Sequence, residues 1–249
     1  MITTVTFDLW NTLIQDTREN GEIRAGQRIS RIKDQLNNHQ FQITELALEH
    51  GYQKCIDHCK NIKSQGLDLG FPEQIYQFLE LSSPHIYAKL PFKLIQMIEN
   101  IYSEIYLEYP SKLHNYTHDI LVKLKSSGYK IGLISNTSMT PGITFRKFLF
   151  HNKIAPLFDA LIFSDELLAS KPSTYLFEHA LQKLNSSPFQ TVHVGDQLET
   201  DILGANLSGI NSLLVNKDIT TDEFINIIPD KYATDLSEVF SGIESLNTP

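Results

Sequence analysis

The sequence predicts an α/β fold: a doubly wound, Rossmann-like parallel sheet that carries an inserted all-helical domain. Three observations lead to this expectation. Short runs of strand-forming residues alternate with helix-like segments in the second half of the chain, as in sheets built from strand–helix–strand units. Polar side chains follow four of the runs directly. About 120 residues without a convincing strand separate the first run from the second, which is too long for an ordinary connection.

Five runs of strand-forming residues are expected to build the sheet. They cover residues 2–7, 129–134, 160–163, 191–194 and 211–215. Segments with apolar residues at helical spacing accompany them, at residues 118–128, 172–187 and 199–209. Because parallel sheets of this kind bind ligands at the carboxyl ends of their strands, the polar residues at those ends are the candidates for function.

The long interval after the first run is expected to form a helical domain of its own. Helical periods recur there, at residues 24–36, 43–62, 72–82 and 92–109. We therefore expect an α/β core made of residues 1–15 and 106–249, with a helical cap formed by residues 16–105.

Composition and charge narrow the class of function. The chain has 249 residues, of which 41% are hydrophobic, so it can bury a substantial core. A net charge of −8 argues against non-specific nucleic-acid binding, which needs a basic surface. No run approaches the roughly 20 apolar residues of a membrane span, no signal peptide is evident, and the two cysteines make no disulfide framework. We expect a cytoplasmic protein that binds neither nucleic acid nor membrane, and the sequence leaves its oligomeric state open.

The polar residues at the strand ends suggest one shared site. Asp8 ends the first run, Ser135–Thr137 follow the second, Lys171 comes after the third, and Asp196 and Asp201 follow the fourth. The carboxyl ends of parallel strands meet at one edge of the sheet, so these side chains are expected to converge.

Such a cluster of carboxylates calls for a cation. Oxygen ligands favour Mg²⁺. A carboxylate beside Mg²⁺ and a lysine stays ionised and can act as a nucleophile. Mg²⁺ and Lys171 together would offset the charge of a phosphoryl group during in-line transfer, and Ser135 or Thr137 could hold its oxygens.

Four segments, taken in order, also resemble the four motifs of the haloacid dehalogenase-like (HAD) hydrolase superfamily. They read "FDLWNTL", "ISNTS", "SKPSTYLFEHAL" and "VGDQLETDILGA", and they look most like the helical-cap (C1) branch, whose cap lies between motifs one and two. The resemblance implies that Asp8 is a nucleophile that forms an aspartyl intermediate. It also implies that Ser135 or Thr137 binds the transferred group and that Lys171 fixes it electrostatically.

The resemblance extends to the metal and substrate sites. It implies that Asp8, the backbone carbonyl of Trp10, and Asp196 hold Mg²⁺, with Asp201 either a direct ligand or one step removed. The residues that we expect to contact the substrate are Trp10, Thr12, Asn136 and Thr137. Asn11 fills a position that often holds Gly, and asparagine tolerates a left-handed turn better than most residues.

Trp10 departs from the pattern of the phosphatases in this superfamily, which usually carry a second aspartate there. That aspartate protonates the leaving oxygen and then activates water, whereas indole cannot accept a proton. Losing a general acid–base typically costs about 10²–10⁴-fold in rate. Trp10 is interpreted either as packing between core and cap or as a wall of the substrate pocket. Candidates for a replacement acid–base in the cap are His39, Glu49 and His50.

Three functions are compatible with these residues. The favoured one is Mg²⁺-dependent hydrolysis of a small phosphorylated metabolite through an aspartyl-phosphate. A dehalogenase-like enzyme is the second, because those relatives also carry an aromatic residue two positions after the nucleophile. They are metal-free, however, and lack the paired Asp196 and Asp201. The third is a non-catalytic module that binds phosphate or regulates a partner, which Trp10 would explain.

A basic stripe in the cap has two interpretations. Arg24, Arg28 and Arg31 share one helix face, and residues 18–33 hold five basic residues against two acidic ones. The stripe could steer an acidic substrate into the crevice. A solvated helix face is the simpler interpretation and is the one favoured here.

Overall fold

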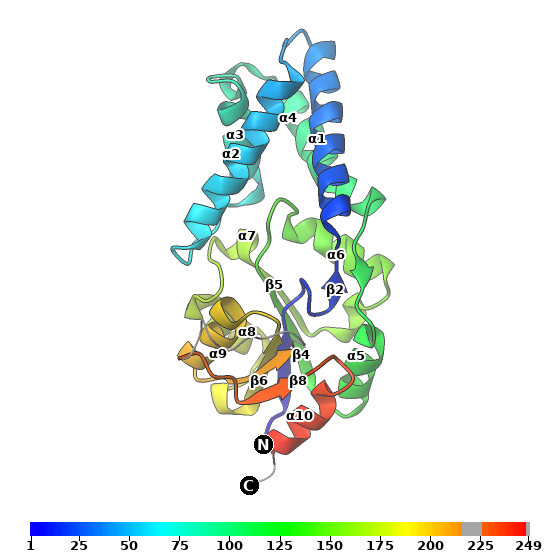
Figure 1. The fold of residues 1–249 in the computed structure, drawn as a ribbon, viewed down its shortest axis with the longest axis vertical. Helices are drawn as coiled ribbons and strands as arrows, with labels where there is room; N and C mark the ends of the chain where they lie inside the picture. Colours follow the sequence, from blue (N-terminus) through cyan, green and yellow to red (C-terminus); the bar gives the residue numbers. More distant parts are fainter. Residues whose placement is uncertain (216–225, 248–249) are drawn as a thin grey trace.

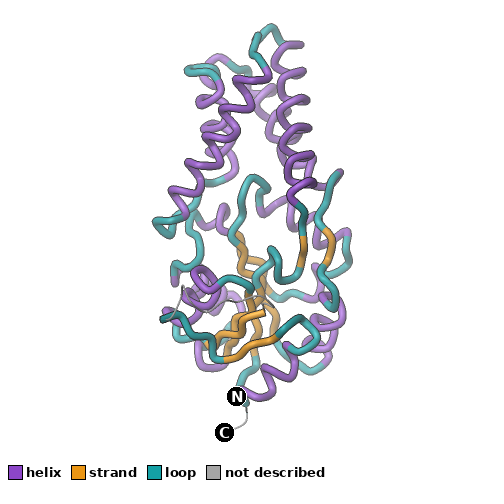
Figure 2. Tube along the Cα trace, in the orientation of Figure 1, coloured by secondary structure: helices purple, strands orange, loops and turns teal. Residues whose placement is uncertain are grey.

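The computed structural model describes residues 1–215 and 226–247 and confirms the α/β fold. A six-stranded parallel sheet in the order β5-β4-β1-β6-β7-β8 forms its centre (Figures 1 and 2). Its strands are β1 (Thr4–Phe7), β4 (Lys130–Ser135), β5 (Ala160–Phe163), β6 (Thr191–Gly195), β7 (Asn211–Val215) and β8 (Lys231–Ala233). All five expected runs are strands, and the short edge strand β8 was not anticipated.

Helices cover both faces of the sheet, as a doubly wound fold requires. Alternate strand residues such as Val5 and Phe7 pack with α5 (Thr117–Ser126), α6 (Gly142–His151) and α10 (Val239–Leu246). The opposite face packs against α8 (Thr174–Leu184) and α9 (Leu203–Leu207). The short helix α7 (Ser164–Leu167) follows β5 directly. Strand β1 is buried on both sides, so it fixes the residue after it, Asp8, near the middle of the sheet edge.

Residues 18–108 are largely helical, as expected. The α-helices of this segment are α1 (Arg18–Asn38), α2 (Glu45–Lys63), α3 (Phe71–Ser82) and α4 (Phe92–Glu108). They enclose an apolar cluster of their own around Ile32, Phe78 and Tyr102. Helix α1 begins six residues before the expected segment, because the Thr17 side chain accepts a hydrogen bond from Asn20 N and caps the helix there.

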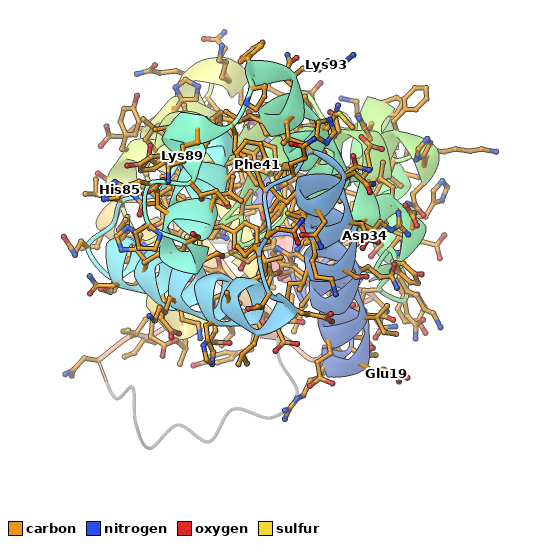
Figure 3. All side chains as sticks on the ribbon, turned by 90° about the horizontal axis from the view of Figure 1, so that it is seen from above. Glu19, Asp34, Phe41, His85, Lys89 and Lys93 are labelled. Carbon is orange, nitrogen blue, oxygen red and sulfur yellow. The ribbon has the colours of Figure 1, made fainter. Side chains whose placement is uncertain are left out.

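The helices α1–α4 stand above the carboxyl edge of the sheet (Figure 1). Seen from above, the exposed His85, Lys89 and Lys93 lie on the outer surface of this helical insert (Figure 3). The division into residues 16–105 and the remainder stays a prediction. No helix in the described part of the chain combines the length and apolar character that crossing a membrane requires.

Two backbone connections join the helical insert to the sheet domain in the described part of the chain. On one side, the antiparallel ribbon of β2 (Ile14–Gln15) and β3 (Lys112–Leu113) carries the chain in and out. On the other side, the loop between α2 and α3 pairs with residues 168–170, through hydrogen bonds from Asp68 N to Leu168 O (3.1 Å) and from Ser170 N to Gly66 O (3.0 Å). The buried Asp68 carboxylate accepts hydrogen bonds from Lys63 and Ser164. The backbone of the insert is therefore joined to the sheet domain at two separate places, in addition to side-chain contacts such as that of Arg28 with Thr140.

Candidate active site

Asp8, Lys171 and Asp201 meet at the carboxyl edge of the sheet. Asp8 follows β1, and Asp196 follows the neighbouring strand β6. The Lys171 ammonium lies 2.5 Å from Asp8 Oδ1 and 2.6 Å from Asp201 Oδ1. The convergence expected from the strand ends is therefore present for the charged residues. They open onto a cavity of about 340 Å³ lined by Asp8, Trp10, Asn11, Asn136, Ser138, Lys171, Asp196, Gln197, Thr200 and Asp201.

The three carboxylates suit a divalent cation. Oxygen atoms of Asp8, Asp196 and Asp201 all lie within 4.8 Å of one another. Burial, reinforced by Asp201 and Asp196 and opposed by Lys171, raises the pKa of Asp8 to about 7. Burial and Asp201 likewise raise the pKa of Asp196 to about 6. The raised pKa values show that the negative charges of these carboxylates are not fully balanced by nearby cationic side chains. A bound cation would balance them, and three carboxylate groups are ligands that suit Mg²⁺.

Lys171 and Asp201 form a buried ion pair. Burial alone would raise the pKa of Asp201, but Lys171 and His193 hold it below its usual value. Burial alone would also lower the pKa of Lys171, but Asp201 and Asp8 raise it above its ordinary value. The lysine therefore stays charged at neutral pH.

His193 supports Asp201 from inside strand β6 and was missed at the sequence level. Its Nε2 lies 3.4 Å from Asp201 Oδ1, and its Nδ1 lies 2.9 Å from Thr6 Oγ1. Burial lowers the pKa of His193, so the neutral imidazole can donate to Asp201 from Nε2. The sequence feature that could have indicated it is a histidine between two valines in the apolar run of β6.

Two backbone features let the acidic loops come this close. A side chain at Gly195 would place its Cβ 2.3 Å from the Asp201 carboxyl carbon, so glycine is required there. Asp201 lies on a π-helical turn, η4 (Leu198–Ile202), and accepts a hydrogen bond from Gln197 N (3.1 Å). Asn11 has φ 57°, which confirms the expected left-handed turn after Asp8.

Trp10 both packs and lines the cavity. Its ring meets Tyr106 and Phe145 edge to face, with centroids 6.2 and 5.3 Å away, and it also lines the cavity. Its Nε1 is buried and has no hydrogen-bond partner within the described ranges. Trp10 thus packs between aromatic side chains and lines the cavity, while its role as a wall of the substrate pocket stays a prediction.

Of the uncharged residues Asn136 and Thr12, which were expected to contact the substrate, only Asn136 lines the cavity. Asn136 lines the cavity and exchanges two hydrogen bonds with the Lys171 backbone, at 2.8 and 3.1 Å. Thr12 is buried beside Asp196, with its Oγ1 3.5 Å from Asp196 Oδ1. Asn136 thus helps to position the lysine backbone, and substrate contacts by Asn136 and Thr12 stay predictions.

Ser135 and Thr137 are both buried and do not line the cavity. Ser135 is fully buried at the end of β4. Thr137 directs its Oγ1 toward Ser164 (3.1 Å) and Asp68 (3.4 Å). Their proposed binding of a phosphoryl group stays a prediction. Sequence reasoning did not single out three other residues that line the cavity, Ser138, Gln197 and Thr200.

The cap residues differ most from expectation. Arg24 and Arg28 are 6% and 2% exposed, so the solvated-face interpretation is wrong for both. They are buried because α1 packs against α4 and the loop after β4. Arg31 is half-buried and pairs with Glu108. The suggested replacement acid–bases, His39, Glu49 and His50, are exposed and line neither the Asp8 cavity nor the cavity beneath α1.

Comparison with curated proteins and solved structures identifies relatives. Glyceraldehyde 3-phosphate phosphatase of Methanothermobacter thermautotrophicus is 38% identical over 109 residues, covering 43% of this chain and 46% of that protein. The protein of the same name from Methanocaldococcus jannaschii is 32% identical over 120 residues, covering 45% and 50%. The chain spans about half the length of these curated relatives.

Two solved structures share the fold over nearly the whole chain. A HAD phosphatase from Thermococcus onnurineus has a TM-score of 0.64 at 20% identity and covers 96% of this chain and 97% of its own. A 2-haloacid dehalogenase from Pseudomonas syringae pv. Tomato DC3000 has a TM-score of 0.67 at 17% identity, covering 98% and 99%. At such identities the likeness concerns the fold alone.

A protein-family model matches the chain and identifies its family. The model for haloacid dehalogenase-like hydrolases matches residues 44–215. This range includes Lys171, Asp196 and Asp201, while Asp8 precedes it and is brought to them by the fold. Since the match covers well over half of the chain, the protein belongs to the haloacid dehalogenase-like hydrolase family.

Proposed function

We propose that the protein is a Mg²⁺-dependent phosphatase that hydrolyses a small phosphorylated metabolite through an aspartyl-phosphate on Asp8. The observation that carries the proposal is the Lys171 ammonium shared between Asp8 and Asp201 beside Asp196. The names of the two curated relatives support a small sugar-phosphate type of substrate.

The chemistry assigned to Asp8 has two steps. In the first, a carboxylate oxygen of Asp8 attacks phosphorus while the bond from phosphorus to the leaving oxygen breaks. In the second, water attacks the same phosphorus, which releases inorganic phosphate and restores the carboxylate. Mg²⁺ held by Asp8, Asp196 and Asp201 would supply positive charge to the phosphoryl oxygens.

Lys171 stabilises both steps electrostatically. Its ammonium is buried, fixed by two carboxylates and held in place through the backbone bonds to Asn136. A fixed charge in a site of low dielectric interacts strongly with developing negative charge and needs little reorganisation.

Trp10 limits the proposed reaction to certain substrates. With indole in place of the usual aspartate, the leaving oxygen takes its proton from solvent or from another group. Esters with acidic leaving groups should therefore react faster than alkyl phosphates.

The proposal is tested with Asp8→Asn, which removes the nucleophile but preserves size. Wild-type protein should release phosphate from p-nitrophenyl phosphate and from glyceraldehyde 3-phosphate only when Mg²⁺ is supplied. Asp8→Asn should show no turnover while unfolding at a temperature close to that of wild type. Release of halide from a 2-haloacid without metal would contradict the phosphatase and favour the dehalogenase-like alternative, which Trp10 supports. Absence of turnover on every substrate would favour a non-catalytic phosphate-binding module.

The setting of the reaction is also part of the proposal. We expect a small-molecule substrate and no nucleic-acid partner, which the net charge of −8 supports. A cytoplasmic location is supported by Cys55 and Cys59, which are both buried and free.

A further inference from the structure

A second cavity lies beneath the helical insert, next to the site of Asp8. Its volume is about 480 Å³, and it shares Trp10 and Ser138 with the first cavity. The two cavities therefore adjoin, with Trp10 in the lining of both. The second one is lined by Trp10, Arg18, Gly21, Glu22, Arg24, Ala25, Arg28, Tyr52, Gln53, Ile56, Ser138, Met139 and Thr140.

Arg28 is a buried cation in this lining whose protein partners are all uncharged. Its Nε donates to Tyr102 O at 2.8 Å. Its two terminal nitrogens donate to Tyr52 Oη and Thr140 Oγ1, each at 3.1 Å. The guanidinium also lies 4.4 Å from the centre of the Tyr102 ring. Among residues 1–215 and 226–247, no carboxylate pairs with it.

The neighbouring arginines of the same cavity make the contrast clear. Arg24 lies one turn earlier on α1 and is also buried, but its guanidinium pairs with the Asp16 carboxylate. Arg18 pairs with Glu22 at the exposed start of the helix. Arg28 alone of the three basic residues in this lining keeps an uncompensated charge, and it is the most deeply buried of them.

An uncompensated buried charge is costly unless something pairs with it. A guanidinium carries five N–H donors in a fork that matches anionic oxygen groups. Three of these donors have the partners named above. The side chain therefore offers charge and remaining donors to a ligand that occupies the cavity.

We propose that Arg28 binds a second anionic oxygen group of the substrate, at the end remote from the phosphoryl group that Asp8 attacks. This inference rests on the proposed phosphatase function and specifies its substrate class: a phosphomonoester that also carries a carboxylate or a second phosphate. Adjoining cavities give the two groups separate places, and the atoms that connect the groups would lie beside Trp10 and Ser138, which line both cavities.

Matched substrates test the proposal. Glyceraldehyde 3-phosphate and 3-phosphoglycerate differ in an aldehyde against a carboxylate, and 1,3-propanediol monophosphate and bisphosphate differ in a second phosphate. Wild-type kcat/KM should favour the anionic member of at least one pair by about 30-fold, as charged hydrogen bonds in proteins allow, and the preferred pair identifies the group. Equal use of both members in both pairs would overturn the proposal.

Variants locate the preference at Arg28. Arg28→Gln should remove it mainly by raising KM for the anionic member, with less than about 3-fold change for the neutral one, whereas a purely structural arginine would lower both equally. Arg28→Lys keeps the charge without the fork and should retain part of the preference. Arg31→Gln, three residues on along α1 and outside both cavities, serves as the matched control and should behave like wild type. Thermal unfolding verifies that each variant is folded.

A binding experiment separates this inference from the proposed function. Calorimetry on Asp8→Asn measures the affinity for the same four compounds without any turnover. If no phosphate ester is hydrolysed, the phosphatase fails, yet a binding preference for the anionic member that Arg28→Gln abolishes would still support the anion site. Equal affinity for both members of both pairs would refute it.

Discussion

Trp10 holds its position through aromatic packing as well as through its place in the site. Its edge-to-face partners come from α4 (Tyr106) and α6 (Phe145), and Tyr106 in turn receives the Arg24 guanidinium, 5.2 Å from its ring centre. A change at residue 10 therefore alters the contact between the helical insert and the sheet domain together with the chemistry.

Trp10→Asp should separate these two roles. Removing the indole leaves a space between Tyr106 and Phe145 and should lower the free energy of unfolding by about 3–5 kcal/mol. In the folded fraction, the new carboxyl supplies a proton donor and acceptor, so kcat on alkyl phosphates should rise by at least about 10-fold. Trp10→Asn is the control, because it has the same size but transfers no proton. Equal gains in the two variants would assign the effect to space rather than to acid–base chemistry.

At the residue scale, the sequence predicted the charged groups better than the uncharged ones. Asp8 and Asp196 directly follow neighbouring strands, so their convergence follows from the sheet topology. Lys171 comes after β5 and the short helix α7 and reaches Asp8 through this longer connection. Thr137 faces Asp68, a residue 69 positions away in the chain, and no local pattern reveals such a contact. Arg28 was expected on a solvated helix face but is buried, because periodicity does not tell which elements cover a helix face.

At the scale of elements, the sequence predicted the long helices and the buried strands. It did not predict the short strands, which form only through contacts with distant parts of the chain. Helix α2 differs from its expected segment by one or two residues at each end, because a period of apolar residues sets its length. The ribbon strand β2 and the edge strand β8 have two and three residues. Strands this short form only because a distant partner strand is present.

The loop between α2 and α3 carries the second attachment of the helical insert, and Asp68 is its centre. Asp68→Asn should lower the free energy of unfolding by about 2 kcal/mol, because a buried charged acceptor of several hydrogen bonds is lost. Denaturant unfolding measures the loss, and hydrogen exchange at the Asp68 and Ser170 amides should speed up. Asp57→Asn, the same change at an exposed site on α2, should have little effect. If both variants unfold alike, the attachment contributes nothing.

For the whole molecule, the acidic cluster links metal binding to pH. The pKa values of Asp8 and Asp196, about 7 and about 6, mean that the metal-free native state holds protons that the unfolded chain has released. Without metal, the free energy of unfolding should therefore fall as pH rises from about 4 to about 7. Because Mg²⁺ must displace those protons, its affinity should rise over the range from about pH 5.5 to about pH 7 and then level off.

The metal-induced rise in melting temperature measures this linkage. It should be small near about pH 5.5 and larger near about pH 8 at one fixed Mg²⁺ concentration. Asp8→Asn removes one of the two titrating carboxyls and should flatten the profile. A rise that is equal at both pH values in wild type would contradict the assignment of these carboxylates as ligands.

The backbone pairing beside Asp68 also ties the placement of the helical insert to the placement of the Lys171 charge. The β2–β3 ribbon and the loop that holds Asp68 lie on opposite sides of the molecule (Figure 1). The loop forms backbone hydrogen bonds with residues 168–170. Lys171 is the next residue in the chain. The segment that fastens the insert therefore ends beside the charge on which the proposed chemistry depends.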